Sequence, residues 1–175
     1  MSGSTPLLNI PNALSFLRLP LAVLFIVTDS PWLRALIIVL AAITDGLDGW
    51  LARRLGQQTG AGQLVDPITD KLFVLVAMGT MTARGELQPW MVVLLLARDI
   101  YTSFAFFIIK AMGWQVRFKA RFIGKTVTVL QFSALIAALV RPDLLLILVI
   151  AVLIASLIAI ADYTLAILAE RRRIG

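Results

Sequence analysis

The sequence contains no cysteine and no histidine. The absence of cysteine excludes disulfide bonds, thiolate nucleophiles and cysteine metal sites. The absence of histidine excludes Ser-His-Asp triads, histidine general bases and metals bound by imidazole. Any chemistry must therefore use carboxylates, hydroxyls, amines and guanidinium groups.

Charged residues are also scarce. They make up 15% of the 175 residues, whereas 60% are hydrophobic, and a soluble domain needs about a quarter of its residues charged. The mean hydropathy of +0.94 agrees with this. The net charge of +6 is explained more simply by anionic lipid head groups and loop orientation than by nucleic acid. The composition predicts an integral membrane protein.

Turns and charged segments divide the chain into six apolar stretches. These are Ala13–Val27, Trp32–Leu51, Lys71–Ala83, Leu87–Ile109, Phe122–Val140 and Leu144–Leu168. Several are shorter than the roughly 20 residues that a membrane-spanning helix needs, so their polar flanks must continue the same helices. We expect an all-α polytopic protein with six transmembrane helices. It forms one domain, 1–175, with a short N-terminal segment, 1–12, and a basic C-terminal tail, 169–175.

The basic residues predict the orientation of these helices. The N-terminus lacks the basic start and cleavage site of a secretory signal, so we expect the first apolar stretch to remain in the protein. Six spans place both termini on one side, and basic residues favour the cytosol. Nine fall in alternate loops and the tail, and three in the opposite loops. The nine are Arg53, Arg54, Lys110, Arg117, Lys119, Arg121, Arg171, Arg172 and Arg173, and the three are Arg34, Arg84 and Arg141. The termini are therefore expected in the cytosol.

Four of the ten acidic residues, Asp45, Asp48, Asp66 and Asp70, fall within 26 positions. The members of each pair are three or four residues apart, which places them on one face of a helix. The segment from Arg53 to Gly62 can return the chain and bring the two faces together. Asp45 lies about 20 Å along the helix from Trp32 at 1.5 Å per residue, in the cytosolic half of the membrane.

Four converging carboxylates repel one another, and their pKa values rise unless cations neutralise them. A set of oxygen ligands without sulfur or nitrogen favours Mg²⁺ or Mn²⁺. Two such ions suit phosphoryl transfer. The alternative is that the aspartates cap helices or form salt bridges with Arg53, Arg54 and Lys71, although ionisable groups at membrane depth are usually functional.

The run from Asp45 to Asp70 resembles the signature of the CDP-alcohol phosphotransferase family, D-x2-D-G-x2-A-R-x8-G-x3-D-x3-D. All eight positions match, namely Asp45, Asp48, Gly49, Ala52, Arg53, Gly62, Asp66 and Asp70. The resemblance extends from Asn9–Asn12 and Arg18 to the stretch Gly124–Gln131. It implies a six-helix membrane enzyme, usually a homodimer, that transfers the phosphatidyl group of CDP-diacylglycerol to an alcohol and releases CMP.

The resemblance also implies roles for individual residues. Asp45, Asp48 and Asp66 would bind the metals, with Asp70 also at the site and acting as the base that takes the proton of the acceptor hydroxyl. Gly49 and Ala52 would keep one helix face bare for the nucleotide, and Arg53 would offer a planar donor to phosphate. The expected residues for CDP-diacylglycerol are Pro11, Asn12, Gly49, Ala52, Arg53, Thr59 and Gly62. Helix packing, orientation signals and helix capping are the alternatives for these residues.

Four cations lie within nine residues on the cytosolic side and are candidates for the acceptor's phosphate: Arg117, Lys119, Arg121 and Lys125. A topology signal that contacts anionic lipid is the alternative. Arg98 is a further candidate, about 14 Å into the fourth span from Pro89. Because adjacent helical residues do not face each other, we expect Arg98 and Asp99 to have separate partners. A structural pair of Arg98 with Asp162 or with a site aspartate is the alternative.

The residues around Arg98 leave two acceptors open. We expect glycerol 3-phosphate, giving phosphatidylglycerophosphate. Enzymes of the family with that product typically carry a further arginine about eight residues later, where this chain has Phe106. The run Ala97-Arg98-Asp99 is similar to the family's cardiolipin synthases, whose acceptor is phosphatidylglycerol. A transporter whose aspartates bind a permeating cation, or a non-catalytic scaffold, are the alternatives from other classes. We expect the enzyme in a bacterial cell (inner) membrane, with its active site facing the cytosol.

Overall fold

The structure is a computed structural model. It describes the backbone of residues 16–55, 62–112 and 122–174. Side chains are described for residues 16–44, 47, 71–105, 107–109, 111–112 and 123–168.

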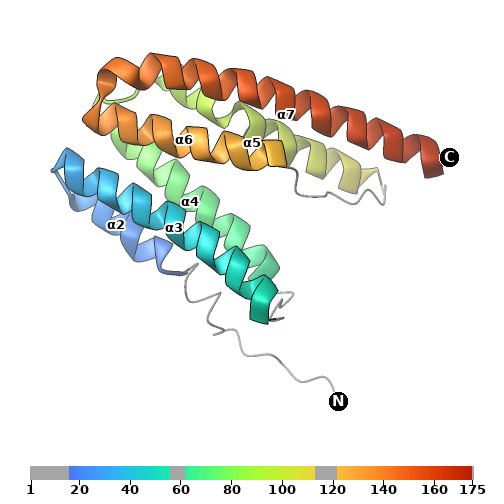
Figure 1. The fold of residues 1–175 in the computed structure, drawn as a ribbon, viewed down its shortest axis with the longest axis horizontal. Helices are drawn as coiled ribbons and strands as arrows, with labels where there is room; N and C mark the ends of the chain where they lie inside the picture. The colour runs from blue at the N-terminus through green and yellow to red at the C-terminus, as the bar shows by residue number, and fades with distance from the viewer. Residues whose placement is uncertain (1–15, 56–61, 113–121, 175) are drawn as a thin grey trace. The chain divides into compact units, whose positions relative to one another are not determined.

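Every regular element in these ranges is a helix, which confirms the all-α prediction (Figure 1). The α-helices are α2 (Arg18–Val27), α3 (Pro31–Leu55), α4 (Gly62–Ala83), α5 (Pro89–Ala111), α6 (Phe122–Val140) and α7 (Leu145–Ile174), and a 3-10 turn, η1 (Pro142–Leu144), precedes α7. The polar flanks do continue the helices, because α3 runs beyond Leu51 and α4 begins before Lys71. The basic segment expected as a tail also continues α7 as far as Ile174.

Proline and glycine set several of these boundaries. Helices α3 and α5 begin at Pro31 and Pro89, where the fixed φ of proline suits the first helical position and its missing N–H needs no partner. Helix α4 ends in a Schellman motif. The N–H of Glu86 donates to the carbonyl of Met81 at 2.9 Å, and that of Gly85 donates to the carbonyl of Thr82 at 3.0 Å. Gly85 has φ of 75°, a left-handed conformation that glycine adopts without strain.

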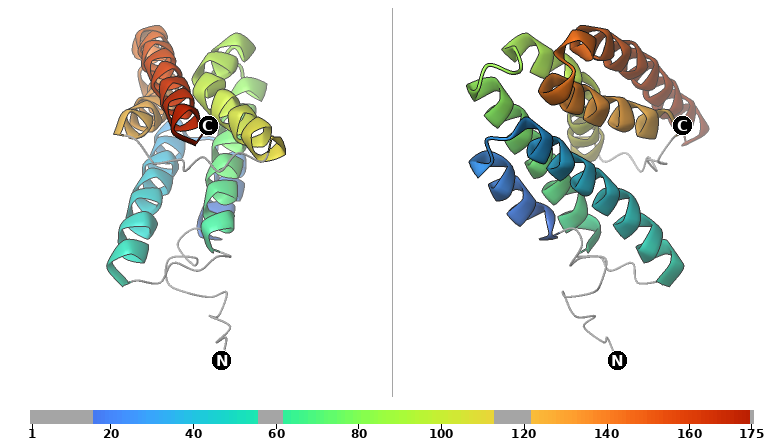
Figure 2. Two further views of the ribbon diagram at one scale, coloured as in Figure 1. Left: turned by 90° about the vertical axis from the view of Figure 1, so that its right-hand side faces the viewer. Right: turned by 60° about the vertical axis from the view of Figure 1, so that its left-hand side comes forward.

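The chain divides into two compact units, Met1–Leu87 and Gln88–Gly175. In the first unit α2 packs against α3 and α4, as two further views show (Figure 2). Small buried residues such as Ala22, Ala41 and Ala77 allow the helices to approach closely. The rings of Phe25 and Phe73 meet edge to face with centroids 6.4 Å apart.

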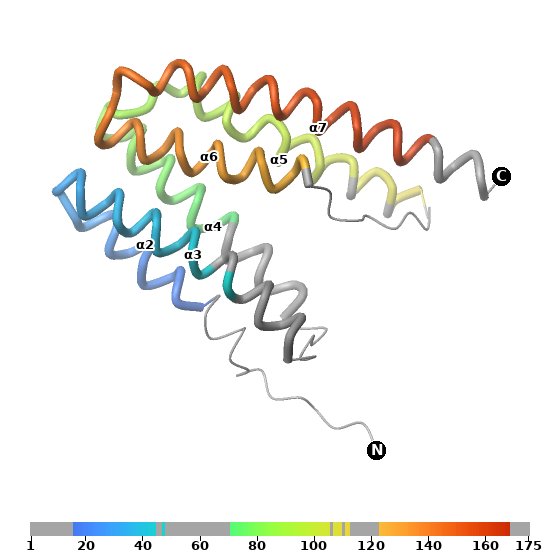
Figure 3. Tube along the Cα trace, in the orientation of Figure 1, coloured from blue at the N-terminus to red at the C-terminus, as the bar shows by residue number. Residues whose placement is uncertain are grey.

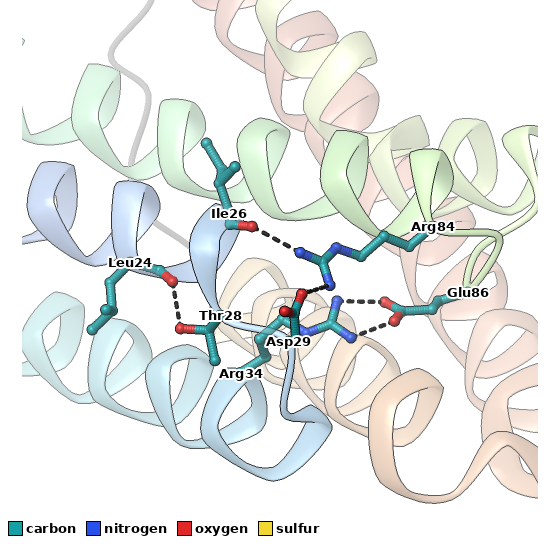
Figure 4. Close-up of polar contacts among 7 residues, drawn as sticks. All are labelled: Leu24, Ile26, Thr28, Asp29, Arg34, Arg84 and Glu86. Carbon is teal, nitrogen blue, oxygen red and sulfur yellow. Dashed lines mark hydrogen bonds and ion pairs between the residues drawn. The ribbon is translucent and has the colours of Figure 1, made fainter.

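A buried arginine joins all three helices of this unit at the end where α2 stops and α3 begins (Figure 4). The Arg34 side chain is only 2% exposed and donates two parallel hydrogen bonds to the carboxylate of Glu86, one of them 2.8 Å long. Its guanidinium also lies 5.6 Å from the centroid of the Phe25 ring, within the range of a cation-π contact. Arg34 thereby links α3 to α2 and to the turn after α4.

The other two arginines expected opposite the basic loops are also paired. Arg84 donates to Asp29 at 2.8 Å and to the carbonyl of Ile26 at 2.8 Å. Arg141 donates twice to Asp143, at 3.1 and 3.0 Å. Each of these three arginines therefore has a carboxylate partner.

In the second unit, α7 packs against both α6 and α5. In the Cα trace of Figure 3, α6 and α7 run side by side and are joined by the turn at η1. The buried residues at the centre of the unit are mostly aliphatic and include Leu95, Val127, Leu135 and Val152. Gln131 and Ser156 are the buried polar residues among the described side chains of this unit.

Within the described part of the chain, three helical stretches are long and apolar enough to cross a membrane: Pro89–Ile109, Ile123–Val140 and Pro142–Leu168. Three shorter apolar helices, Arg18–Val27, Pro31–Thr44 and Lys71–Ala83, correspond to the other three expected spans. The length and apolar character of these helices agree with an integral membrane protein.

Candidate active site

All four aspartates of the motif lie within helices. Asp45 and Asp48 belong to α3, and Asp66 and Asp70 belong to α4. The prediction that the two aspartates of each pair share one face requires these segments to be helical, and the backbone is helical in both. The side chains of these residues lie outside the described ones. No cluster of three acidic residues occurs among the side chains that are described.

The remaining motif residues flank the same connection. Gly49, Ala52 and Arg53 lie in the last turns of α3, and Gly62 begins α4. The helical ends of α3 and α4 therefore carry all eight motif positions. Other predicted residues fall outside the described ranges: Pro11, Asn12, Thr59, Arg117, Lys119 and Arg121.

Arg98, on α5, has a different partner from the one expected. Its Nη1 lies 3.0 Å from Oδ1 of Asp99, its neighbour in sequence. The prediction of separate partners was wrong because the long arginine side chain can turn back along the helix surface and reach an adjacent carboxylate. The two side chains are 17% and 26% exposed, so the pair is shielded but not sealed from ligands.

A buried glutamine fixes Asp99. Nε2 of Gln131, on α6, donates to the carbonyl of Leu95 at 3.1 Å and lies 3.4 Å from Oδ2 of Asp99. Gln131 is 4% exposed, and a buried amide with two partners is strongly held in place. One oxygen of Asp99 thus faces Gln131 and the other holds the Arg98 guanidinium.

Gly124, in the first turn of α6, lies beside Nη2 of that guanidinium. A Cβ atom at this position would be 3.0 Å from Nη2 of Arg98 and 3.0 Å from the hydroxyl oxygen of Tyr163 on α7. Tyr101 and Thr164, which follow Arg98 and Tyr163 along their helices, share a hydrogen bond of 2.5 Å between α5 and α7. The ends of Arg98 and Tyr163 therefore meet over a residue without a side chain.

The polar cluster formed by Arg98, Asp99, Gln131, Gly124 and Tyr163 was only partly foreseen. Arg98 was predicted as an acceptor ligand because of its depth, and the Gly124–Gln131 stretch was noted as part of the resemblance. The roles of Gly124 and Tyr163 were missed, since Tyr163 lies 39 positions further along the chain. The sequence signal that pointed to Gly124 was its position next to Lys125, a candidate ligand. In the structure the Lys125 side chain is exposed at the start of α6.

Within this cluster the Nε of Arg98 is buried and has no acceptor among the described residues. The Tyr163 hydroxyl is likewise not hydrogen-bonded to any described residue. Unsatisfied buried donors such as this Nε are rare in folded proteins. The guanidinium is therefore held by Asp99 through Nη1, and its Nη2 faces Gly124.

Comparison with known proteins links these features to one family. The sequence profile of the family described as CDP-alcohol phosphatidyltransferase matches residues 8–167. A CDP-diacylglycerol–glycerol-3-phosphate 3-phosphatidyltransferase of Escherichia coli strain K12 is 36% identical over 146 residues, which cover 78% of this chain and 79% of the relative. Proteins of the same description from Sodalis glossinidius and from Shigella flexneri serotype 5b match with the same identity and the same coverage.

Proposed function

The chain belongs to the CDP-alcohol phosphatidyltransferase family, and we propose that it transfers the phosphatidyl group of CDP-diacylglycerol to glycerol 3-phosphate. The observation that carries this proposal is the complete set of eight motif positions, in the C-terminal part of α3 and the N-terminal part of α4. The acceptor follows from relatives that are 36% identical over most of the chain and are named for that reaction.

In the proposed reaction an oxygen of the acceptor hydroxyl attacks the phosphorus on the diacylglycerol side of the pyrophosphate. The new phosphorus–oxygen bond forms as the bond to CMP breaks. Asp70 accepts the proton of the attacking hydroxyl, and CMP leaves with the electron pair. A carboxylate can act as this base near neutral pH when the hydroxyl is polarised.

Asp45, Asp48, Asp66 and Asp70 fit a divalent cation because they supply oxygen ligands alone, in a chain that has neither histidine nor cysteine. These residues would hold Mg²⁺ or Mn²⁺, with two ions as the expected number. When bound, the ions neutralise charge on the pyrophosphate and on the departing CMP.

Residues around the aspartates are proposed to bind the donor lipid. Gly49 and Ala52 on α3 leave room for the nucleotide against the helix, and Arg53 in the next turn offers a planar donor to the pyrophosphate. Gly62, at the start of α4, gives the same freedom on the other side of the connection. Pro11, Asn12 and Thr59 complete the proposed set.

The acceptor's phosphate is proposed to bind on the second unit. Arg98 presents its Nη2 beside the first turn of α6, and Lys125 lies exposed in the same turn. The N-terminus of a helix also favours anions. Arg117, Lys119 and Arg121, in the segment that precedes α6, would add further positive charge.

We propose that the protein crosses the membrane six times as one domain, 1–175, with the termini and the active site in the cytosol. The pairing of Arg34, Arg84 and Arg141 with carboxylates supports this orientation. Among the described residues each of these three arginines has a carboxylate partner, whereas the basic residues of the alternate loops and of the end of α7 would lie on the cytosolic side. A homodimer in a bacterial cell (inner) membrane completes the proposal.

A second acceptor has a specific observation in its favour. Phe106 stands eight residues after Arg98, where an additional arginine would help to bind a small phosphorylated alcohol. Phosphatidylglycerol, which needs less positive charge than glycerol 3-phosphate, would then be the acceptor.

The decisive experiment measures CMP release from CDP-diacylglycerol by the purified protein in mixed micelles with Mg²⁺ or Mn²⁺. The acceptors are glycerol 3-phosphate, phosphatidylglycerol, glycerol and inositol. We expect CMP only with glycerol 3-phosphate. CMP with phosphatidylglycerol alone would establish the second acceptor. Cation flux into vesicles without CMP release from any alcohol would refute the enzyme and favour a transporter.

A further inference from the structure

The first turn of α6 contains Gly124, although the helical backbone conformation there does not require a glycine. Gly124 is buried and helical, and alanine is more favourable than glycine inside a helix by about 1 kcal/mol. Glycine at such a position needs another reason. The structure provides one, because Nη2 of Arg98 and the hydroxyl of Tyr163 both lie 3.0 Å from the point that a Cβ would occupy.

We propose that Gly124 is a positioning residue for the acceptor. The missing side chain lets the Arg98 guanidinium and the Tyr163 hydroxyl lie together at the start of α6, where both donate to the phosphate of the acceptor. This inference rests on the proposed function, since it takes the acceptor to be a phosphate monoester bound at Arg98. It adds Gly124 and Tyr163 to the residues that determine acceptor affinity.

The position of the Arg98 guanidinium is fixed by the contacts of its Nη1 atom. Nη1 of Arg98 is held by Asp99 at 3.0 Å, and the second oxygen of Asp99 faces the buried amide of Gln131 at 3.4 Å. The arginine is therefore anchored through one nitrogen, while Nη2 points to the glycine. A planar guanidinium fixed along one edge offers its remaining donors in a constant direction, which suits phosphate recognition.

The geometry also predicts what an added methyl group does. The two atoms in its way are the far end of a flexible arginine and a hydroxyl at the tip of a tyrosine. Neither is backbone, so both can move by a few tenths of an ångström while the helices stay in place. Gly124→Ala should therefore leave the fold intact and displace the two donors from the positions at which they meet the phosphate.

Gly79 offers a matched control. It is also a helical glycine, on α4, and a Cβ at that position would meet nothing within 4 Å. Gly79→Ala makes the same chemical change without displacing a donor. A second variant, Tyr163→Phe, removes the hydroxyl alone and keeps the ring that packs in the second unit.

The test is a steady-state analysis of CMP release, with glycerol 3-phosphate and CDP-diacylglycerol varied in turn, together with thermal unfolding of each variant in the same detergent. We expect Gly124→Ala to raise the KM for glycerol 3-phosphate about tenfold, since a hydrogen bond to a charged group contributes about 1.5–3 kcal/mol. Tyr163→Phe should also raise that KM about tenfold, because the hydroxyl donates to the same charged phosphate. The KM for CDP-diacylglycerol, kcat and Tm should change little, and Gly79→Ala should resemble the wild type in KM.

Two results would overturn the inference alone. One is an unchanged KM for glycerol 3-phosphate in both variants, with normal wild-type turnover. The other is a parallel rise in the KM for both substrates, which would indicate a general distortion of the protein. If Gly124→Ala does not fold, the Tyr163→Phe result decides in the same way. A wild-type protein that releases no CMP with glycerol 3-phosphate would overturn the proposed function, and this inference with it.

Discussion

Removal of the Glu86 carboxylate should destabilise the first unit far more than removal of the Asp29 carboxylate. Glu86 is the partner of Arg34, which is 2% exposed, whereas Asp29 is 91% exposed and pairs with Arg84, which is 31% exposed. Removing one member of a buried ion pair costs about 3–5 kcal/mol, because a charge is left buried without its partner. An exposed pair contributes about 0.2–1 kcal/mol.

The Glu86 side chain is itself 22% exposed, so water can reach the space left by Glu86→Ala. The lower end of the range therefore applies, about 3 kcal/mol for Glu86→Ala against less than about 1 kcal/mol for Asp29→Ala. For domains of this size each kcal/mol shifts Tm by about 2–4 °C. The expected difference in Tm between the two variants is then at least about 4 °C.

The measurement is thermal unfolding of the purified variants in one detergent, at one salt concentration. A double variant, Arg34→Met with Glu86→Leu, should recover most of the loss, since replacing both members of a buried pair with apolar residues is often neutral. Equal Tm values for Glu86→Ala and Asp29→Ala would show that burial of Arg34 does not determine the strength of the pair, and would refute the reasoning.

Three further predictions concern the site and the turns. Asp70→Asn should abolish CMP release and leave Tm unchanged, because the amide cannot accept the hydroxyl proton, whereas Asp29→Asn should remain fully active. Removal of divalent cations with a chelator should stop CMP release, and Mg²⁺ or Mn²⁺ should restore it. Gly85→Ala should destabilise the protein by about 1–2 kcal/mol because its φ is 75°, whereas Gly79→Ala should stabilise it by about 0.5–1 kcal/mol, as measured by unfolding.

Each of these predictions has a contrary result. Turnover in Asp70→Asn would assign the base to another residue, and activity after chelation would contradict the metal proposal. A Cβ would meet no atom within 4 Å at either Gly85 or Gly79, so the two glycine variants differ only in backbone conformation. If Gly85→Ala and Gly79→Ala changed the stability equally, residue 85 would not keep its left-handed backbone conformation.

The sequence predicted the helices well because proline, glycine and charged residues stand at their ends. Pro31 and Pro89 begin helices and Gly85 ends one, each for a local reason. The end of α7 was harder to place, since arginine is a good helix former and a basic tail can continue a helix as easily as leave it. The structure continues α7 to Ile174.

Contacts between distant residues could not be predicted in the same way. The partner of Arg34 depends on which residue the turn after α4 presents, and the role of Gly124 depends on which side chains of α5 and α7 lie over it. Spacing rules for single helices do not contain that information. The same rules gave the wrong prediction of separate partners for Arg98 and Asp99. They describe the positions of Cβ atoms on a helix and not the reach of a long side chain. The convergence of the four aspartates stays a prediction.

The pairing of Arg34 with Glu86 has a consequence for the order in which the protein is made. The two residues are 52 positions apart, so Arg34 leaves the ribosome well before the carboxylate that neutralises it. Helices α2 and α3 can associate early through their own side chains, but the guanidinium remains without its carboxylate until α4 and its glycine turn have been synthesised. A truncated chain that ends before α4 would therefore lack the contact that links Arg34 to the turn after α4.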